Sequence, residues 1–94
     1  MLVIANHDIH DPEKFWALAQ TVTASLPLGF KLHSVMPSMD MKTGTCLWEA
    51  PSVMDVQKFI DEGTGSFSNN SCFQVNEAAS IGLPKVEMEA AVHN

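Results

Sequence analysis

This chain of 94 residues is poor in basic side chains: it holds five Lys and Arg against eleven Asp and Glu, a formal net charge of −6. Proteins that bind phosphate backbones or anionic membrane surfaces present a basic face, so the deficit argues against nucleic-acid and membrane partners. No apolar run approaches the roughly 20 residues that span a bilayer. The N-terminal stretch MLVIANHDIHD also lacks the basic segment and cleavage site of a secretory signal. We therefore expect a cytoplasmic protein.

Cysteines and the signatures of common catalytic sites are scarce as well. The cysteines are Cys46 and Cys72, too few and too far apart for a disulfide framework, so we expect reduced thiols. The GxSxG, GxxxxGK and GxGxxG motifs are all absent from the sequence. Charged residues make up only 17% of the chain and apolar residues 46%. So small a domain cannot bury this many apolar residues in its own core. The high apolar fraction therefore favours a homodimer, whose interface would cover the excess.

What the sequence does contain is a regular alternation of strand and helix patterns over residues 1–84, which predicts one domain, with 85–94 as a C-terminal tail or short extra strand. Period-two alternation predicts strands at residues 2–9, 30–36, 44–50 and 71–76. Helical spacing after the caps Asp11 and Ser52 predicts helices at about 12–25 and 53–62. The Gly-, Ser- and Asn-rich stretch 63–70 is predicted to be a loop.

The order β-α-β-β-α-β is that of a ferredoxin-like α+β fold, an antiparallel four-stranded sheet with two helices on one face. In that topology the first and third strands are central neighbours. One face of the sheet packs on the helices, so the other face must be covered or used in some other way.

The hairpin of the second and third strands gathers most of the chemically distinctive side chains, namely His33, Cys46, Trp48 and Glu49. If its turn is centred at residues 40–41, His33 lies opposite Trp48. Alternation then places His33, Cys46 and Trp48 on one face of the hairpin and Glu49 on the other. We expect the helices to pack on the face that carries Glu49.

Imidazole and thiolate ligands suit nickel, copper and zinc, so His33 and Cys46, joined by His7 from the first strand, form a candidate metal site. His33, Trp48 and His7 equally form a candidate small-ligand site, with Trp48 stacking on a flat ligand. No compact metal spacing such as CxxC or HxxxH is present. A strand His or Cys also serves as an ordinary packing residue, and both interpretations stay open.

The segments LHS at 32–34, KT at 42–43 and EAPS at 49–52, together with Cys46, resemble a family of small ferredoxin-like domains of largely unknown function. That family includes nickel-binding, nickel-responsive bacterial proteins. The resemblance implies a homodimer whose sheets face each other, as in the wider dimeric α+β barrel group. It also implies a transition-metal site, with nickel or zinc as the metal.

Together these features favour a non-enzymatic homodimer that holds a small ligand or a divalent transition metal between its sheets. The alternative is an enzyme of the dimeric α+β barrel group, such as a cofactorless oxygenase or isomerase acting on a small apolar substrate. It requires a closed apolar pocket with one His or carboxylate at its wall, whereas a metal site requires converging ligands. A third possibility is an interaction module whose open sheet face is consumed by the dimer contact.

Overall fold

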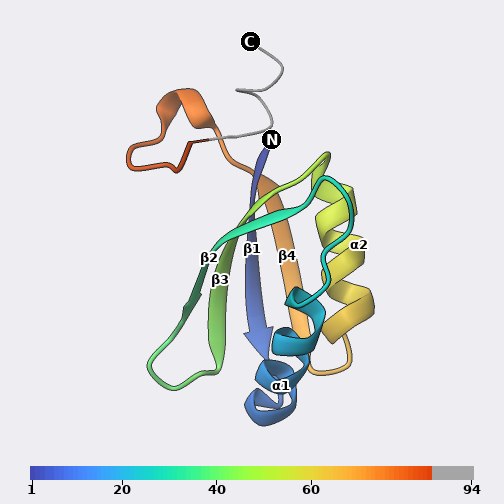
Figure 1. Cartoon of the computed structure of the whole chain (residues 1–94). Coiled ribbons are helices and arrows are strands. Elements are labelled where there is room, and N and C mark those ends of the chain that lie inside the picture. Colours follow the sequence, from blue (N-terminus) through green and yellow to red (C-terminus); the bar gives the residue numbers. More distant parts are fainter. Residues whose placement is uncertain (86–94) are drawn as a thin grey trace.

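Two helices lie on one face of a four-stranded antiparallel sheet in the computed structural model, which describes residues 1–85 (Figure 1). The strand order is β2-β3-β1-β4. The elements are β1 (Leu2–Ile9), α1 (Pro12–Thr23), β2 (Lys31–Pro37), β3 (Thr43–Glu49), α2 (Val53–Thr64), β4 (Ser68–Gln74) and a 3₁₀ turn at Glu77–Ala79. The predicted α+β class is confirmed, and the arrangement is compatible with a ferredoxin-like fold. The tail strand predicted within residues 86–92 lies outside the described residues.

The central strand is β1, which pairs antiparallel with β3 on one side and β4 on the other. Its bounds are those predicted, and it is an interior strand, as its apolar start on both faces indicated. Leu2 and Val3, which point to opposite faces, are both fully buried. No helix within the described residues has the length and apolarity needed to cross a membrane.

Both helices begin at the predicted caps. The Asp11 side chain accepts a hydrogen bond from the backbone N–H of Lys14, and the Ser52 side chain accepts one from the backbone N–H of Asp55. Each bond satisfies a donor that the first turn of a helix leaves without an intrahelical partner.

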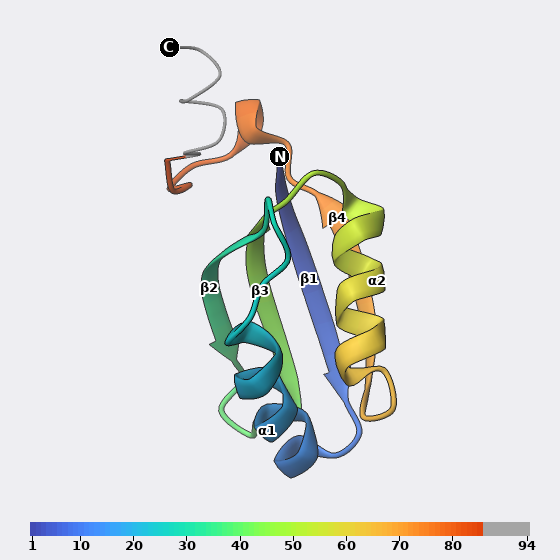
Figure 2. The same ribbon diagram turned by 45° about the vertical axis from the view of Figure 1, so that its right-hand side comes forward.

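The core lies between the sheet and the helices (Figure 2), and α2 contributes more to it than α1. Helix α2 buries Val56, Ile60 and Thr64, whereas α1 has one fully buried side chain, Phe15. Trp48 from β3 packs edge-on against Phe30 and Phe59 with ring centroids 6.1 and 5.9 Å away. Because α1 is the less deeply packed helix, space is left beneath it.

The register of the hairpin is partly as predicted. Val35 pairs with Cys46, which is the predicted pairing, but a β-bulge between Leu32 and Ser34 shifts the ladder by one residue. Leu32, and not His33, therefore lies opposite Trp48. The predicted position of His33 beside Trp48 is wrong, because an extra residue in a strand reverses the side-chain alternation beyond it.

The assignment of the two sheet faces was also wrong. Cys46 and Trp48 belong to the cluster that packs on the helices, so Glu49, by alternation, points to the opposite, open face. The cause is the contact of Trp48 with Phe59 of α2, which buries the larger aromatic side chain on the helix side.

Strand β4 begins at Ser68, earlier than predicted, so the last part of the predicted loop 63–70 is strand. Asn69 and Asn70 pair with Asp8 and His7 of β1. Asn has a weak intrinsic preference for strands, but the ladder with a buried central strand outweighs that preference here.

Candidate functional site

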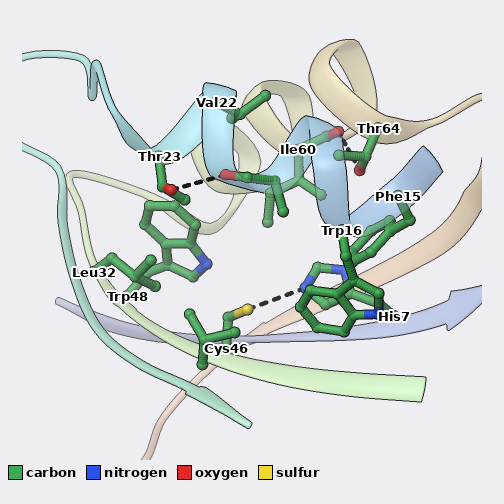
Figure 3. Close-up of a pocket in the computed structure, with 12 residues that line it drawn as sticks. His7, Phe15, Trp16, Val22, Thr23, Leu32, Cys46, Trp48, Ile60 and Thr64 are labelled. Atoms are coloured by element: carbon green, nitrogen blue, oxygen red, sulfur yellow. Dashed lines mark hydrogen bonds between the residues drawn. The ribbon is translucent and has the colours of Figure 1, made fainter. Parts of the chain in front are cut away.

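A small apolar cavity of about 40 Å³ lies between α1 and the sheet (Figure 3). Three of the residues singled out from the sequence line it: His7, Cys46 and Trp48. The walls are completed by apolar side chains of both helices, among them Phe15 and Ile60. A water molecule needs about 10–15 Å³, so the cavity of about 40 Å³ has room for roughly three or four water-sized groups. It lies on the helix side of the sheet and not on the face predicted to meet a partner.

His7 and Cys46 are hydrogen-bonded to each other at the cavity wall, with 3.3 Å between His7 Nε2 and Cys46 Sγ. The other ring nitrogen, Nδ1, lies 2.7 Å from Asn70 Oδ1. The side-chain amide of Asn70 donates to Asp61 Oδ1 at 3.0 Å, so its oxygen faces His7 as an acceptor. Nδ1 of His7 therefore carries the hydrogen, and Nε2 accepts from the Cys46 thiol.

The orientation of Asn70 is fixed by further hydrogen bonds. Ser68 Oγ donates to Asn70 Oδ1 at 2.8 Å. The amide of Gln57 on α2 donates to both the Asn70 backbone carbonyl and Asp61 Oδ2. Each additional partner restricts the rotamers of the Asn70 side chain, so the plane and tautomer of the His7 ring are set by residues of α2 and β4.

Burial keeps both members of this pair uncharged. Desolvation lowers the pKa of His7, with the Asn70 hydrogen bond acting in the opposite direction. Desolvation, and to a smaller extent the neighbouring Cys72, raises the pKa of Cys46 to about 11. Near neutral pH the pair is therefore a thiol and a neutral imidazole, and not a thiolate–imidazolium ion pair.

Trp48 presents an unused donor to the cavity. Its side chain is only 3% exposed, and its indole Nε1 is the buried side-chain polar atom that has no hydrogen-bond partner among the described residues. Figure 3 shows the indole nitrogen directed toward the interior of the cavity. A buried N–H without an acceptor costs about 1–3 kcal/mol. A ligand with an acceptor atom in the cavity would recover that cost.

The cavity wall nearest the hairpin turn is the indole of Trp16. Its Nε1 donates to the Met41 carbonyl at 3.0 Å, and Met41 has a left-handed backbone with φ of 65°. A Cβ on Gly44 would come within 3.2 Å of the Trp16 ring, so glycine is what allows the indole to lie this close to β3. Trp16 is thus a wall residue held by a single side-chain hydrogen bond to the β2–β3 turn.

His33 lies outside this cavity, apart from the other residues of both predicted sites. His33 Nε2 is 3.0 Å from Glu49 Oε1, and the two side chains are 8% and 0% exposed. This pair occupies the open face, across the sheet from Cys46. Within residues 1–85, no three His, Cys, Asp or Glu side chains gather as metal ligands. The structure therefore sets His33 apart from Cys46 and His7 of the predicted metal set, and it brings together His7 and Trp48 of the predicted ligand set.

Asn70, which orients His7, was missed from the sequence because it falls in the stretch predicted to be a loop. The sequence does hold a pattern that identifies Asn70 as a strand residue. Ser68, Asn70 and Cys72 alternate with the period of a strand, and the register with β1 sets Asn70 beside His7. The strand prediction began at residue 71, close to the β-formers Phe73 and Val75.

The open face of the sheet divides into an apolar and a polar part. Phe73 and Met36 are 50% and 53% exposed and, with Ile4 and Leu47, line a groove of about 410 Å³ that also runs along residues 75–83. Nearer the β2–β3 turn, a shallow recess of about 400 Å³ is lined mainly by polar side chains, among them Asn6, Asp8, Thr43, Thr45, Asn69 and Ser71.

Comparison with curated proteins and with solved structures gave no match. The model of one family, described as a domain of unknown function (DUF8652), matches residues 4–83. This range contains His7, Cys46, Trp48 and Asn70, and it covers most of the chain. The chain therefore belongs to the DUF8652 family.

Proposed function

We propose that this chain is a binding protein for a small, neutral, largely apolar molecule that carries one hydrogen-bond acceptor. The supporting observation is the buried indole N–H of Trp48, which has no partner among the described residues and points into the apolar cavity beneath α1. The uncharged state of His7 and Cys46 favours a neutral ligand, because a charged one would be desolvated without a counter-ion.

The size of the cavity separates this proposal from the enzymatic alternative. A single His at the wall of an apolar pocket is what a cofactorless oxygenase or isomerase would require, and His7 occupies such a place. Sites for aromatic or polyketide-sized substrates measure about 300–1,000 Å³, however. The cavity of about 40 Å³ suits a ligand of only a few heavy atoms.

A nickel or zinc site is not part of the proposal. His7 and Cys46 supply two ligands, and the described residues bring no third His, Cys, Asp or Glu to them. A protein transition-metal site uses three or four such ligands. The resemblance to nickel-responsive proteins stays a prediction, since the family match carries no function.

Acetone, a neutral ketone with roughly four heavy atoms, is a suitable probe, and its dissociation constant can be no lower than about 40 μM at the ligand-efficiency ceiling. In ¹H–¹⁵N spectra we expect acetone to shift the indole resonance of Trp48 saturably, because its oxygen accepts the free N–H. The indole resonance of Trp16 should stay in place, because that N–H is bound to the Met41 carbonyl. A Trp16→Phe variant assigns the two resonances.

The matched control is Trp48→Phe, which keeps a ring in the cavity wall and removes the donor. Losing one hydrogen bond should weaken acetone binding about threefold to tenfold, measured on the methyl resonances of Val22 and Ile60. An unchanged affinity would remove Trp48 as the polar contact. A wild-type indole resonance that never shifts would contradict the proposal itself.

We also propose that two copies pair through their open sheet faces, in the manner of dimeric α+β barrels. Four strands about 4.8 Å apart and about 23 Å long give a face of roughly 450 Å² per copy. Two such faces approach the roughly 1,000 Å² of a specific interface before residues 75–83 are added. Phe73 and Met36, half exposed beside Ile4 and Leu47, supply the apolar contact that a second copy would cover.

Phe73→Asp should convert the protein from a dimer to a monomer in light scattering, because each copy would bury a carboxylate in the apolar part of the contact. Leu28→Asp is the matched control: Leu28 is fully exposed in the loop between α1 and β2, and the same charge change there should leave the dimer intact. A monomeric wild type, or a Phe73→Asp variant that stays dimeric, would refute pairing through this face.

A further inference from the structure

We propose that Cys46 captures a small aldehyde in the cavity as a reversible hemithioacetal, with His7 carrying the proton and Trp48 donating a hydrogen bond to the aldehyde oxygen. This inference rests on the proposed binding function and names the ligand class. Non-covalent binding would not need the thiol of Cys46, and covalent capture gives this buried thiol a chemical role.

The three groups that such an addition requires meet in one place. The thiol of Cys46 is the nucleophile and lies 3.3 Å from Nε2 of His7, the proton acceptor. The ring of His7 is held by Asn70 at 2.7 Å, which fixes the tautomer with a free Nε2 lone pair. The Trp48 N–H, directed into the same cavity, is available for the oxygen on which negative charge develops. Addition to a carbonyl group uses the same arrangement: a nucleophile, a base, a residue that orients the base, and a hydrogen-bond donor for the oxygen.

The addition balances without any further reactant. As the Cys46 sulfur forms a bond to the carbonyl carbon, the thiol proton moves to His7 Nε2 and the carbonyl π electrons move to oxygen. His7 then returns the same proton to that oxygen, which gives a neutral S–CH(OH)–R adduct. No bond to a leaving group breaks, and nothing is oxidised or reduced. Reactant and product are both uncharged, so burial, which keeps Cys46 and His7 neutral, does not oppose the product.

The cavity selects aldehydes by size and charge. Formaldehyde and acetaldehyde have roughly two or three heavy atoms, within the roughly three or four water-sized groups that the cavity of about 40 Å³ admits. None of its lining residues is Asp, Glu, Lys or Arg. An aldehyde that carries a carboxylate or a phosphate would therefore lose its hydration without gaining a counter-ion.

Cys72 does not compete for this role. Cys46 and Cys72 both pair with Ala5, from β3 and from β4, so they stand about two strand spacings, or roughly 10 Å, apart. A disulfide spans less than about 7 Å between Cα atoms, so the two thiols cannot bridge without moving the backbone. Cys72 is also not among the residues that line the cavity, and it therefore provides a matched control.

The test is ¹³C NMR of the full chain with acetaldehyde labelled at the carbonyl carbon. Wild type and Cys72→Ser should show a saturable hemithioacetal carbon resonance, separate from the free aldehyde and its hydrate. Cys46→Ser should lose that resonance, although its hydroxyl can still donate to His7 Nε2 and preserve the wall. His7→Gln should slow formation of the adduct about a hundredfold or more, the usual contribution of a positioned base.

The outcomes separate this inference from the proposed function. A saturable acetone-induced shift of the Trp48 indole with no Cys46-dependent hemithioacetal resonance would overturn covalent capture and leave non-covalent binding standing. A hemithioacetal resonance that survives Cys46→Ser would also overturn the assignment. If neither acetone nor acetaldehyde affects the cavity, both ideas fail together.

Discussion

Trp48→Ala is expected to lower the free energy of unfolding by about 3–5 kcal/mol, the range for removing a buried large aromatic side chain. Trp48 is 3% exposed and packs against Phe30 and Phe59. Its removal would also join the new void to the cavity beneath α1, which leaves the surrounding side chains less able to close around the gap. Urea unfolding followed by circular dichroism measures the change.

Leu28→Ala is the reference for this measurement, because Leu28 is fully exposed and its truncation should change stability by less than about 0.5 kcal/mol. Trp48→Phe should cost much less than Trp48→Ala, since it keeps one ring of the aromatic cluster and discards an N–H that has no protein partner among the described residues. If Trp48→Ala proved no more damaging than Leu28→Ala, the aromatic cluster would not be the centre of the core.

His33→Leu is expected to destabilise the protein by about 1–3 kcal/mol, the cost of removing one hydrogen-bond partner from a buried polar group. The imidazole of His33 lies 3.0 Å from the carboxylate of Glu49, whose side chain is fully buried although it lies on the sheet face away from the helices. Leucine cannot hydrogen-bond, so Glu49 would lose this partner while remaining desolvated. Urea unfolding at neutral pH gives the loss directly.

His10→Leu provides the comparison, because His10 is exposed at the end of β1 and its replacement should be nearly neutral. The double variant His33→Leu, Glu49→Leu tests the cause of the loss. Removing both polar groups should recover part of the stability lost in His33→Leu, because no buried carboxylate is left behind. A double variant less stable than either single variant would show that the pair itself, and not the desolvation of Glu49, carries the effect.

Local patterns in the sequence were sufficient for much of the fold. The bounds of β1 and the two helix caps at Asp11 and Ser52 depend on side chains within a few residues, and all were predicted correctly. The hairpin register near its turn, including the pairing of Val35 with Cys46, was also correct, since the turn sets it. On the N-terminal side of Ser34, at Lys31 and Leu32, the predicted register was wrong. No residue type in the bulge indicates that an extra residue is inserted there.

The candidate site was predicted in part for a similar reason. His7, Cys46 and Trp48 stood out by residue type, and the structure brings them to one cavity. Which sheet face the helices cover depends on distant packing, such as Trp48 against Phe59, and alternation alone does not decide it. Asn70 belongs to the site through pairing with β1, a contact between strands far apart in the sequence.

The bulge at residues 32–34 has a further consequence for how copies of this chain can assemble. Strands β2 and β4 form the two edges of the sheet, where unpaired backbone groups invite another strand to add. The bulge interrupts the edge of β2, and Pro37 at its end has no N–H to donate, while β4 reads SNNSCFQ, rich in weak β-formers. Both edges thus resist open-ended growth of the sheet into fibrils. The proposed pairing of two copies uses the faces instead, where contact between two identical surfaces closes after two copies.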